Sequence, residues 1–389
     1  MLSIGIFTYS TKPRGSVVHA ACLAEALQRK GARVRLYALS KASDGFFRPL
    51  SCDSCLIPAE PAPSDVDALI RQRIAEFRNG IRAFGVEHDI CHAEDCLAAN
   101  ALVAAKAELC GAALVRTVHH VERFESPYLL DCQQRSVASA DLVLSVSQVT
   151  SREVRTAFGR EAPVISNGVD LQRFAVHEGP VQRGVRERLG LTAGDLLILS
   201  VGGVESRKNS LAALQAVALA FAREPQVRWV IAGGASIWEH EDYRREFAGQ
   251  LAQLAPELQA RIMILGTVPE ADLTALYQLS DVLLCPSLQE GFGLCVLEAL
   301  AAKCAVIVPQ GAPFDEYLDE RCASFVDPGS VPQIAAALVR LLRDPALRRR
   351  SAENGYERVQ RHSWDLVAER HLARYESLLR RDSLQQHQF

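Results

Sequence analysis

Short apolar runs alternate with longer helix-like stretches along the whole sequence, and this pattern constrains the fold more than any other feature. Val17–Arg29 and Ala98–Leu109 are typical of the amphipathic or Ala/Leu-rich stretches in between. Strands that alternate with helices form parallel sheets covered on both faces. The series occurs twice, so we expect an α/β protein with two Rossmann-like, doubly wound parallel-sheet domains. The predicted strands are Leu2–Tyr9, Val34–Leu39, Ile90–His92, Ala113–Val118, Leu142–Val146 and Val164–Ile165, then Leu196–Val201, Val227–Ala232, Ile262–Leu265, Val282–Cys285, Ala305–Val308 and Ala323–Val326.

The length of 389 residues suits two domains. Turn-forming residues cluster at Ser166–Asp170, which places the junction there. We predict a first domain over residues 1–170, a second over 171–362, and a C-terminal helix over 363–389 that can return to the first domain. Helical structure is expected to break at Pro345 and again at Ser363–Asp365. Ligands of parallel sheets bind beyond the carboxyl ends of the strands, so we expect the two domains to face a ligand-binding cleft.

Composition excludes several classes of protein. Apolar residues make up 49% and charged residues 23%, as in ordinary globular chains. A net charge of −3 argues against a protein that mainly binds nucleic acid. No apolar run approaches the roughly 20 residues of a membrane span, and we expect a cytoplasmic protein. A cluster of arginines leaves peripheral contact with anionic lipid open, although a solvated helix is the commoner role: Arg340, Arg343, Arg348, Arg349 and Arg350.

The cysteines and acidic pairs do not predict a metal site. The 11 cysteines are interpreted as reduced, mostly buried side chains. Cys52 and Cys55 could bind zinc together with Cys91 and Cys96, but we favour a loop pair without metal because no second Cys-x-x-Cys exists. Asp65–Asp67 imitates a metal-binding motif and is better explained as a helix start with Ser64 as its N-cap.

The strongest local signal is a glycine-rich loop between a predicted strand and a predicted helix, at residues 286–299. Backbone amides at such a helix start lack intrahelical partners and, with the helix dipole, suit a diphosphate. Glycines would let a ligand approach the backbone closely. The alternative is a plain strand–turn–helix unit. The loop residues assigned to this site are Gly291, Phe292, Gly293 and Leu294.

Two glutamates flank this loop. Glu290 precedes it, and Glu298 lies about one turn inside the predicted helix. The two carboxylates could therefore contact different parts of one ligand. The alternative is that an acidic side chain near the helix start is favoured by the helix dipole alone.

Three further segments follow predicted strands. After Gly202 and Gly203, the adjacent cations Arg207 and Lys208 are predicted to open a helix. Cations oppose the dipole there, so we favour phosphate binding over a solvated surface. The long segment Thr8–His19 lacks the G-x-G-x-x-G pattern, which weakens a dinucleotide interpretation. His119, in the third segment, is a weak signal alone.

Together these segments resemble a known family. Glu290 and Glu298, with seven residues between them in EGFGLCVLEALA, resemble the retaining glycosyltransferases of the GT-B fold in family 4. Asp89–Asp95, Thr117–His119, Ser166–Asp170 with Phe174, and Gly202–Lys208 occur in the family's order. The stretch STKPRGSVVH looks like a bacterial subgroup. The resemblance covers nearly the whole chain.

The resemblance implies roles for individual residues. Lys208 would hold the donor diphosphate, Glu298 the nucleotide ribose, and Glu290 the donor sugar. His119 would contact that sugar from the first, acceptor-side domain, and Gly15 would lie under the phosphates.

The chain departs from the family at two positions. Gly203 stands where the family usually has Arg, and Arg207 could supply that charge. Ser16 replaces a second glycine. Readout of the base is expected from backbone near Gly266, Thr267 and Val268 and near Gly233 and Gly234.

The implied reaction is transfer of a sugar from a nucleotide-diphosphate donor to a small-molecule, lipid or glycan acceptor, with retention at the anomeric carbon. The resemblance also implies that a donor phosphate oxygen takes the acceptor proton. We expect no metal and no cofactor beyond the donor. A non-catalytic nucleotide-sugar-binding protein and a nucleotide-sugar epimerase are alternatives. An epimerase would need an acid/base set for elimination, and the sequence shows none that we recognise. The sequence indicates neither the base, the sugar, the acceptor nor the oligomeric state.

Overall fold

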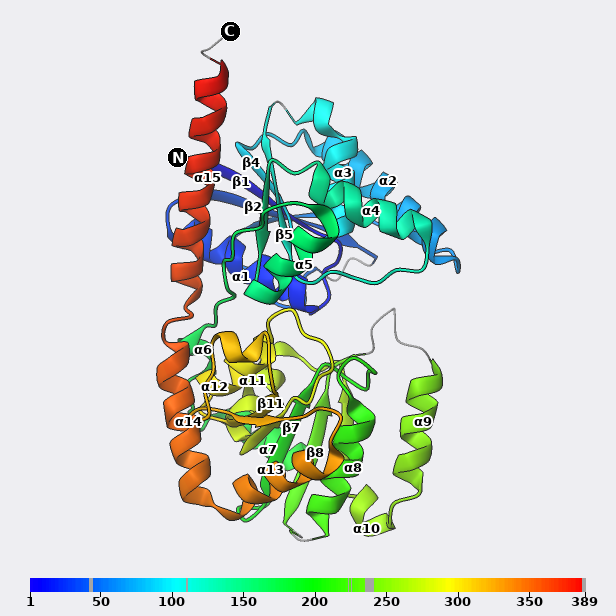
Figure 1. Ribbon diagram of the computed structural model, residues 1–389, viewed down its shortest axis with the longest axis vertical. Coiled ribbons are helices and arrows are strands. Elements are labelled where there is room, and N and C mark those ends of the chain that lie inside the picture. The colour runs from blue at the N-terminus through cyan, green and yellow to red at the C-terminus, as the bar shows by residue number, and fades with distance from the viewer. Residues whose placement is uncertain (42–44, 110, 223, 225, 235–240, 387–389) are drawn as a thin grey trace. The chain divides into compact units, whose positions relative to one another are not determined.

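The computed structural model describes residues 1–41, 45–109, 111–222, 224, 226–234 and 241–386, with side chains described as far as Arg380 (Figure 1). The chain divides into two compact units. Unit 1 comprises Met1–Gly168 and Trp364–Phe389, and unit 2 comprises Val169–Ser363. The start and end of unit 2 pair with each other, because the Val169 amide donates to the His362 carbonyl and Val169 bridges to Ser363.

Unit 1 is built on a parallel six-stranded sheet in the order β3-β2-β1-β4-β5-β6. Its strands are β1 (Ser3–Thr8), β2 (Arg33–Ser40), β3 (Asp53–Pro58), β4 (Ile90–Ala93), β5 (Ala113–Val118) and β6 (Leu142–Ser145). Its helices are α1 (Gly15–Arg29), α2 (Val66–Phe84), α3 (Cys96–Ala104), the 3-10 turn η1 (Lys106–Glu108), α4 (Pro127–Ala138), α5 (Gln148–Phe158) and α15 (Trp364–Gln386). The C-terminal helix α15 packs against α1 (Figure 1).

The burial of their side chains explains which strands of unit 1 could be predicted from the sequence. Every residue of β1 is buried, as expected for an apolar run in a sheet covered on both faces. The edge strand β3 was missed because most of its side chains are exposed or half-buried. Cys55 belongs to β3, so the loop prediction for this cysteine pair was wrong. Val164 forms only an isolated bridge to Ser145 instead of the predicted strand.

Two helix starts differ from the prediction. Asp65, not Ser64, caps α2, because its side chain accepts the Ala68 amide at 2.7 Å. Asp67 instead accepts the Ser126 hydroxyl at 2.8 Å. Helix α1 begins at Gly15 rather than near Val17, so the loop after β1 is shorter than predicted.

Unit 2 has the same strand order as unit 1. Its parallel sheet runs β12-β11-β10-β7-β8-β9. The strands are β7 (Leu196–Val201), β8 (Val227–Ala232), β9 (Ile262–Gly266), β10 (Val282–Leu284), β11 (Ala305–Pro309) and β12 (Ser324–Val326). The helices are α6 (Leu171–Phe174), α7 (Pro180–Arg188), α8 (Ser210–Phe221), α9 (Glu241–Ala252), α10 (Pro256–Gln259), α11 (Glu270–Leu279), α12 (Leu294–Ala301), the 3-10 turn η2 (Phe314–Glu316), α13 (Val331–Arg343) and α14 (Pro345–Val359). The predicted break at Pro345 is confirmed, since Asp344 caps α14 there.

Each sheet has a switch point, where the direction of strand progression reverses. It lies between β1 and β4 in unit 1 and between β7 and β10 in unit 2. Loops that leave the carboxyl ends of these neighbouring strands diverge to opposite faces, and ligands of such sheets bind in the crevice between them. The two switch points are therefore where functional residues should gather.

The arginines of α13 and α14 do not form one uninterrupted basic face. Arg343 pairs with Glu224, and Arg348 Nε lies 3.3 Å from Asp281 Oδ1. Arg349 is exposed. Within the ranges that the structure describes, no helix is both long enough and apolar enough to cross a membrane.

Candidate functional site

An ion pair spans the switch point of unit 2. Lys208 lies in the turn after β7, and Glu290 lies in the loop after β10. Lys208 Nζ donates to Glu290 Oε1 at 2.7 Å. Arg207 Nη1 lies 3.3 Å from Glu290 Oε2 and donates to the Gln289 carbonyl at 3.1 Å. The prediction that both cations open a helix was wrong, because α8 begins at Ser210.

The Lys208–Glu290 pair is largely removed from solvent. Only 15% of the lysine side chain and 9% of the glutamate side chain are exposed. Burial opposes ionisation of the Glu290 carboxyl, but the charges of Lys208 and Arg207 outweigh it and lower its pKa to about 2. Burial likewise opposes the charge on Lys208, yet Glu290 raises its pKa. Both groups are therefore charged at neutral pH.

This pair predicts a pH dependence of stability. The pKa of Glu290 is lowered from 4.5 to about 2 in the folded protein. Its stabilising contribution is therefore complete above the unfolded value and is lost as the pH falls from 4.5 towards 2. The difference in unfolding free energy between the wild type and Glu290→Gln should shrink over this window. Urea unfolding at pH 7, 5 and 3 measures it, and a difference that does not change with pH would contradict the pairing.

Closely packed glycines line the carboxyl ends of β7 and β8. Gly202, Gly203 and Gly233 all have positive φ, at +125°, +81° and +130°. A Cβ atom on Gly203 would lie 2.8 Å from the Gly233 carbonyl oxygen. An arginine therefore cannot replace Gly203 without displacing backbone, which explains the departure from the family pattern. Arg207 is the nearby cation that contacts Glu290 instead.

The glycine-rich loop ends at α12, and its geometry is fixed by aromatic packing. Helix α12 begins at Leu294, and Gly293 before it has φ +93° and makes no side-chain cap. The ring of Phe292 stacks on Tyr317 with centroids 4.7 Å apart. Tyr317 also donates its hydroxyl to the Phe292 carbonyl at 3.0 Å. The helix start thus presents main-chain amides, as an anion site requires.

Gly293 should not tolerate a side chain. A Cβ atom there would lie 2.6 Å from Phe314 Cε1, and the left-handed backbone costs about 1–2 kcal/mol for other residues. We expect Gly293→Ala to lower the unfolding free energy of unit 2 by at least that amount. Gly249, exposed on α9 with nothing within 4 Å of its Cβ position, is the matched control. Gly249→Ala should stabilise by up to about 1 kcal/mol in urea titrations. Equal effects of the two changes would contradict this geometry.

Glu298 lies one turn inside α12 and has a different partner. Its Oε2 accepts the hydroxyl of Tyr277, which comes from α11, at 2.6 Å. Burial raises the pKa of the Glu298 carboxyl, and the Tyr277 hydrogen bond offsets part of that effect. Glu290 and Glu298 are therefore held by separate contacts and can act independently.

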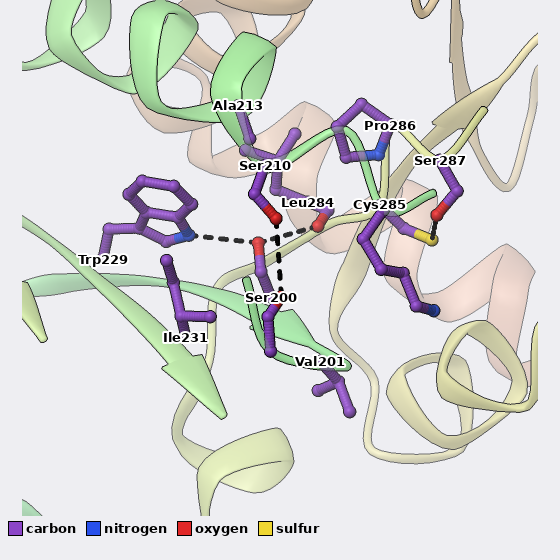
Figure 2. A pocket seen from close by; sticks show the side chains of 12 residues that line it. Ser200, Val201, Ser210, Ala213, Trp229, Ile231, Leu284, Cys285, Pro286 and Ser287 are labelled. Carbon is purple, nitrogen blue, oxygen red and sulfur yellow. Dashed lines mark hydrogen bonds between the residues drawn. The ribbon is translucent and has the colours of Figure 1, made fainter. Parts of the chain in front are cut away.

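A small cavity lies behind these loops. Its volume is about 20 Å³, and Lys208 is among its lining residues. Figure 2 shows Trp229 Nε1 donating to Ser200 Oγ, which donates to the Leu284 carbonyl, at 3.0 and 2.9 Å. Such a volume admits about one water molecule, so the cavity is too small for a nucleotide sugar. A donor would have to bind on the loops themselves.

The remaining residues expected to bind the donor lie in open positions. Gly266 ends β9 with φ +63° and has no atom within 4 Å of its Cβ position. Val268, two residues after Gly266, is half-buried. In unit 1, Gly15 and Ser16 form the first turn of α1, where Gly15 is exposed.

In unit 1, a carboxylate and a histidine meet near the switch point. Glu94 follows β4, and His119 follows the neighbouring strand β5. His119 Nε2 lies 2.9 Å from Glu94 Oε2, and His19 Nε2 of α1 lies 3.7 Å from the same oxygen. Sequence reasoning singled out His119 but missed Glu94 and His19. Both residues could have been found from their segments, because His19 lies in Thr8–His19 and Glu94 lies in Asp89–Asp95, and each residue follows a strand.

His19 and Glu94 are fully buried, and His119 is largely buried. Burial lowers the pKa of His19 to about 4 and places that of His119 well below its ordinary value. Burial raises the pKa of Glu94. Both imidazoles are therefore neutral at physiological pH.

Family models match both units. A model of Glycosyltransferase Family 4 matches residues 13–173, and a model of glycosyl transferases group 1 matches residues 182–358. Together these matches support a family 4 glycosyltransferase. Among curated relatives of this glycosyltransferase, the D-inositol 3-phosphate glycosyltransferase of Corynebacterium urealyticum is 26% identical over 79% of the chain and 76% of its own length. A phosphatidyl-myo-inositol mannosyltransferase of Mycolicibacterium smegmatis is 32% identical, over 60% of the chain and 57% of its own length.

Solved structures show the same fold for this chain. Sucrose-phosphate synthase from Thermosynechococcus elongatus superposes with a TM-score of 0.80 at 21% identity, over 97% of the chain and 99% of its own. Anabaena HepE in complex with UDP-glucose gives 0.76 at 19% identity, over 97% and 100%. At these sequence identities the structural similarity supports the GT-B fold but does not indicate the substrate.

Proposed function

We propose that the protein transfers a sugar from a nucleotide-diphosphate donor to an acceptor with retention of anomeric configuration. The observation that carries the proposal is the Lys208–Glu290 ion pair at the switch point of unit 2, in the loop that leads to the uncapped start of α12. Cations and main-chain amides at the carboxyl ends of parallel strands suit a diphosphate. A carboxylate in the same place suits a sugar that gains positive charge.

The leaving diphosphate gains negative charge as the bond from the anomeric carbon to the phosphate oxygen breaks. Lys208, the amides at the start of α12 and Arg207 would stabilise that charge. The acceptor oxygen forms its bond on the same face of the sugar, and a donor phosphate oxygen takes the acceptor proton. In this scheme Glu290 exchanges its hydrogen bond with Lys208 for contact with the donor sugar, and Glu298 binds the ribose.

The comparisons support sugar transfer in general, and retention and the substrates are part of the proposal. Two relatives carry D-inositol 3-phosphate and phosphatidyl-myo-inositol in their names, and HepE was solved in complex with UDP-glucose. We infer a polyol, glycan or glycolipid acceptor for this chain. The role of His119 toward the donor sugar is a prediction that follows from the family resemblance alone.

A screen of nucleotides and their sugars tests the proposal. Thermal unfolding would be followed with UDP, GDP and ADP and with the corresponding sugar donors. A ligand at 100 times its dissociation constant stabilises the protein by about 2.7 kcal/mol. One base should raise the melting temperature, and its sugar donor should be hydrolysed slowly without an acceptor. Binding without any turnover would instead indicate a nucleotide-sugar sensor.

Transfer should not require a divalent metal. Side-chain cations and helix-start amides stand at the proposed diphosphate position, so no metal is needed to neutralise the leaving group. We expect turnover within about twofold of the untreated value after EDTA treatment and after Mn²⁺ addition. Activity that disappears in EDTA and returns with Mn²⁺ would contradict the proposal.

A further inference from the structure

Three metal-ligating side chains from separate segments converge in unit 1. The ligand atoms of His19, Glu94 and His119 all lie within 4.8 Å of one another. Glu94 Oε2 is 2.9 Å from His119 Nε2 and 3.7 Å from His19 Nε2. In a tetrahedral zinc site with bonds of about 2.0–2.2 Å, neighbouring ligand atoms lie roughly 3.3–3.6 Å apart. The two separations from Glu94 lie on either side of this range, and the two histidine ligand atoms lie within 4.8 Å of each other.

The His19 ring is oriented as a metal ligand should be. Its Nδ1 lies 2.9 Å from Asn167 Oδ1, and an amide oxygen only accepts, so Nδ1 carries the proton. The lone pair is therefore on Nε2, which faces Glu94 and has no hydrogen-bond partner among the described residues. A hydrogen bond to the other ring nitrogen is the usual support of a metal-bound histidine.

In the part of the chain that the structure describes, buried polar atoms without hydrogen-bond partners lie at this cluster of His19, Glu94 and His119. Glu94 Oε1 also lacks a hydrogen-bond partner among the residues that the structure describes. The side chains of Glu94 and His19 are 0% exposed, and 13% of the His119 side chain is exposed. Buried polar groups without partners are rare and each costs about 1–3 kcal/mol. The nearby His92 differs, because Tyr375 and Thr117 contact its two ring nitrogens at 2.6 and 2.7 Å.

We propose that His19, Glu94 and His119 bind one zinc-class divalent cation in unit 1. Two imidazoles and one carboxylate favour Zn²⁺ or Co²⁺ over Mg²⁺ and Ca²⁺, which prefer all-oxygen ligands. Binding would move the proton of neutral His119 from Nε2 to Nδ1 and would place the Glu94 charge against the cation. Three protein ligands leave a fourth position for water or a substrate oxygen.

This site uses His119, which the family resemblance also assigns to the donor sugar, and it departs from the prediction that the chain has no metal site. Metal binding is measured without donor or acceptor. A failure to bind zinc would therefore leave sugar transfer untouched, and a failure of transfer would leave the metal site untouched.

The experiment is calorimetric titration of the EDTA-stripped, full-length protein with Zn²⁺, then with Mg²⁺. We expect one zinc per chain with a dissociation constant below about 1 µM, and no binding of Mg²⁺ at that level. Co²⁺ in place of zinc should give the visible absorption of a four-coordinate site. Glu94→Gln, which keeps the side-chain shape, and His119→Ala should each weaken zinc binding by at least about 100-fold. Asn167→Ala should weaken it about 10- to 100-fold.

Matched controls exclude other ligands. His120, next to His119, pairs with Glu122 at the surface and is 45% exposed, so His120→Ala should bind zinc normally. A Cys52→Ser, Cys55→Ser double variant should also bind normally. Circular dichroism would confirm that each variant folds. Absence of zinc binding, binding unchanged in Glu94→Gln and His119→Ala, or loss of binding only in the cysteine variant would each overturn the proposal.

Discussion

Lys208→Ala should lower kcat/KM about 10²- to 10³-fold, the usual effect of removing one group that stabilises charge in the transition state. Lys208 Nζ lies 2.7 Å from Glu290 Oε1 beside the loop that leads to α12, where the diphosphate is proposed to depart. The ammonium interacts most strongly when the phosphate carries its full negative charge. Most of the loss should therefore appear in kcat at saturating donor. Steady-state kinetics with the donor identified by the thermal screen measures both constants.

Folding of this variant must be checked, because removing one member of a buried ion pair can cost 3–5 kcal/mol. Arg207 lies 3.3 Å from Glu290 and can remain as its counter-charge, so unit 2 should still fold. Lys106→Ala, at an exposed lysine of unit 1, is the control and should leave all constants unchanged. A loss below fivefold for Lys208→Ala in folded protein would remove Lys208 from the diphosphate.

Glu290→Gln and Glu298→Gln should have separable effects. Glu290 is assigned to the sugar, where positive charge develops, so its neutral analogue should lower kcat by about 10² and leave affinity for the nucleoside diphosphate near normal. Glu298 is assigned to the ribose, which does not react. Losing a charged hydrogen bond there should weaken nucleotide binding about 10- to 100-fold and raise the donor KM while kcat changes little.

Calorimetry for the nucleoside diphosphate and turnover at saturating donor distinguish these outcomes. Glu257→Gln, on the exposed helix α10, is the matched control. If Glu290→Gln abolishes nucleotide binding while Glu298→Gln loses only turnover, the two assignments are reversed. If neither variant changes nucleotide affinity or turnover, the loop before α12 has only a structural role and the glycosyltransferase site lies elsewhere.

Strands buried on both faces could be read from the sequence almost residue by residue. The predicted segments Leu196–Val201 and Val227–Ala232 coincide with β7 and β8. Such strands are nearly continuous apolar runs, interrupted here only by Ser200 and Arg228, and turn residues mark their ends. The edge strand β3 carries no such run, because most of its side chains are exposed or half-buried. Its pairing with β2 is set by tertiary contacts rather than by its own pattern.

The candidate site was only partly predictable for a related reason. The loop residues of α12 form a local motif, so they were identified from sequence. The Lys208–Glu290 contact joins residues 82 positions apart and exists because β7 lies beside β10. The apolar pattern does not encode strand order. His19 and Glu94 were missed because only burial and convergence distinguish them from ordinary polar side chains.

The central claim is tested most directly by NMR observation of donor hydrolysis. The protein would be incubated in EDTA with the α-linked nucleotide sugar that stabilises it, without acceptor, and the released sugar would be followed before mutarotation. Retention predicts that the α anomer appears first, at a rate that falls about 10²-fold in Glu290→Gln. First appearance of the β anomer would contradict retention, and no release above the protein-free rate would contradict enzymatic transfer altogether.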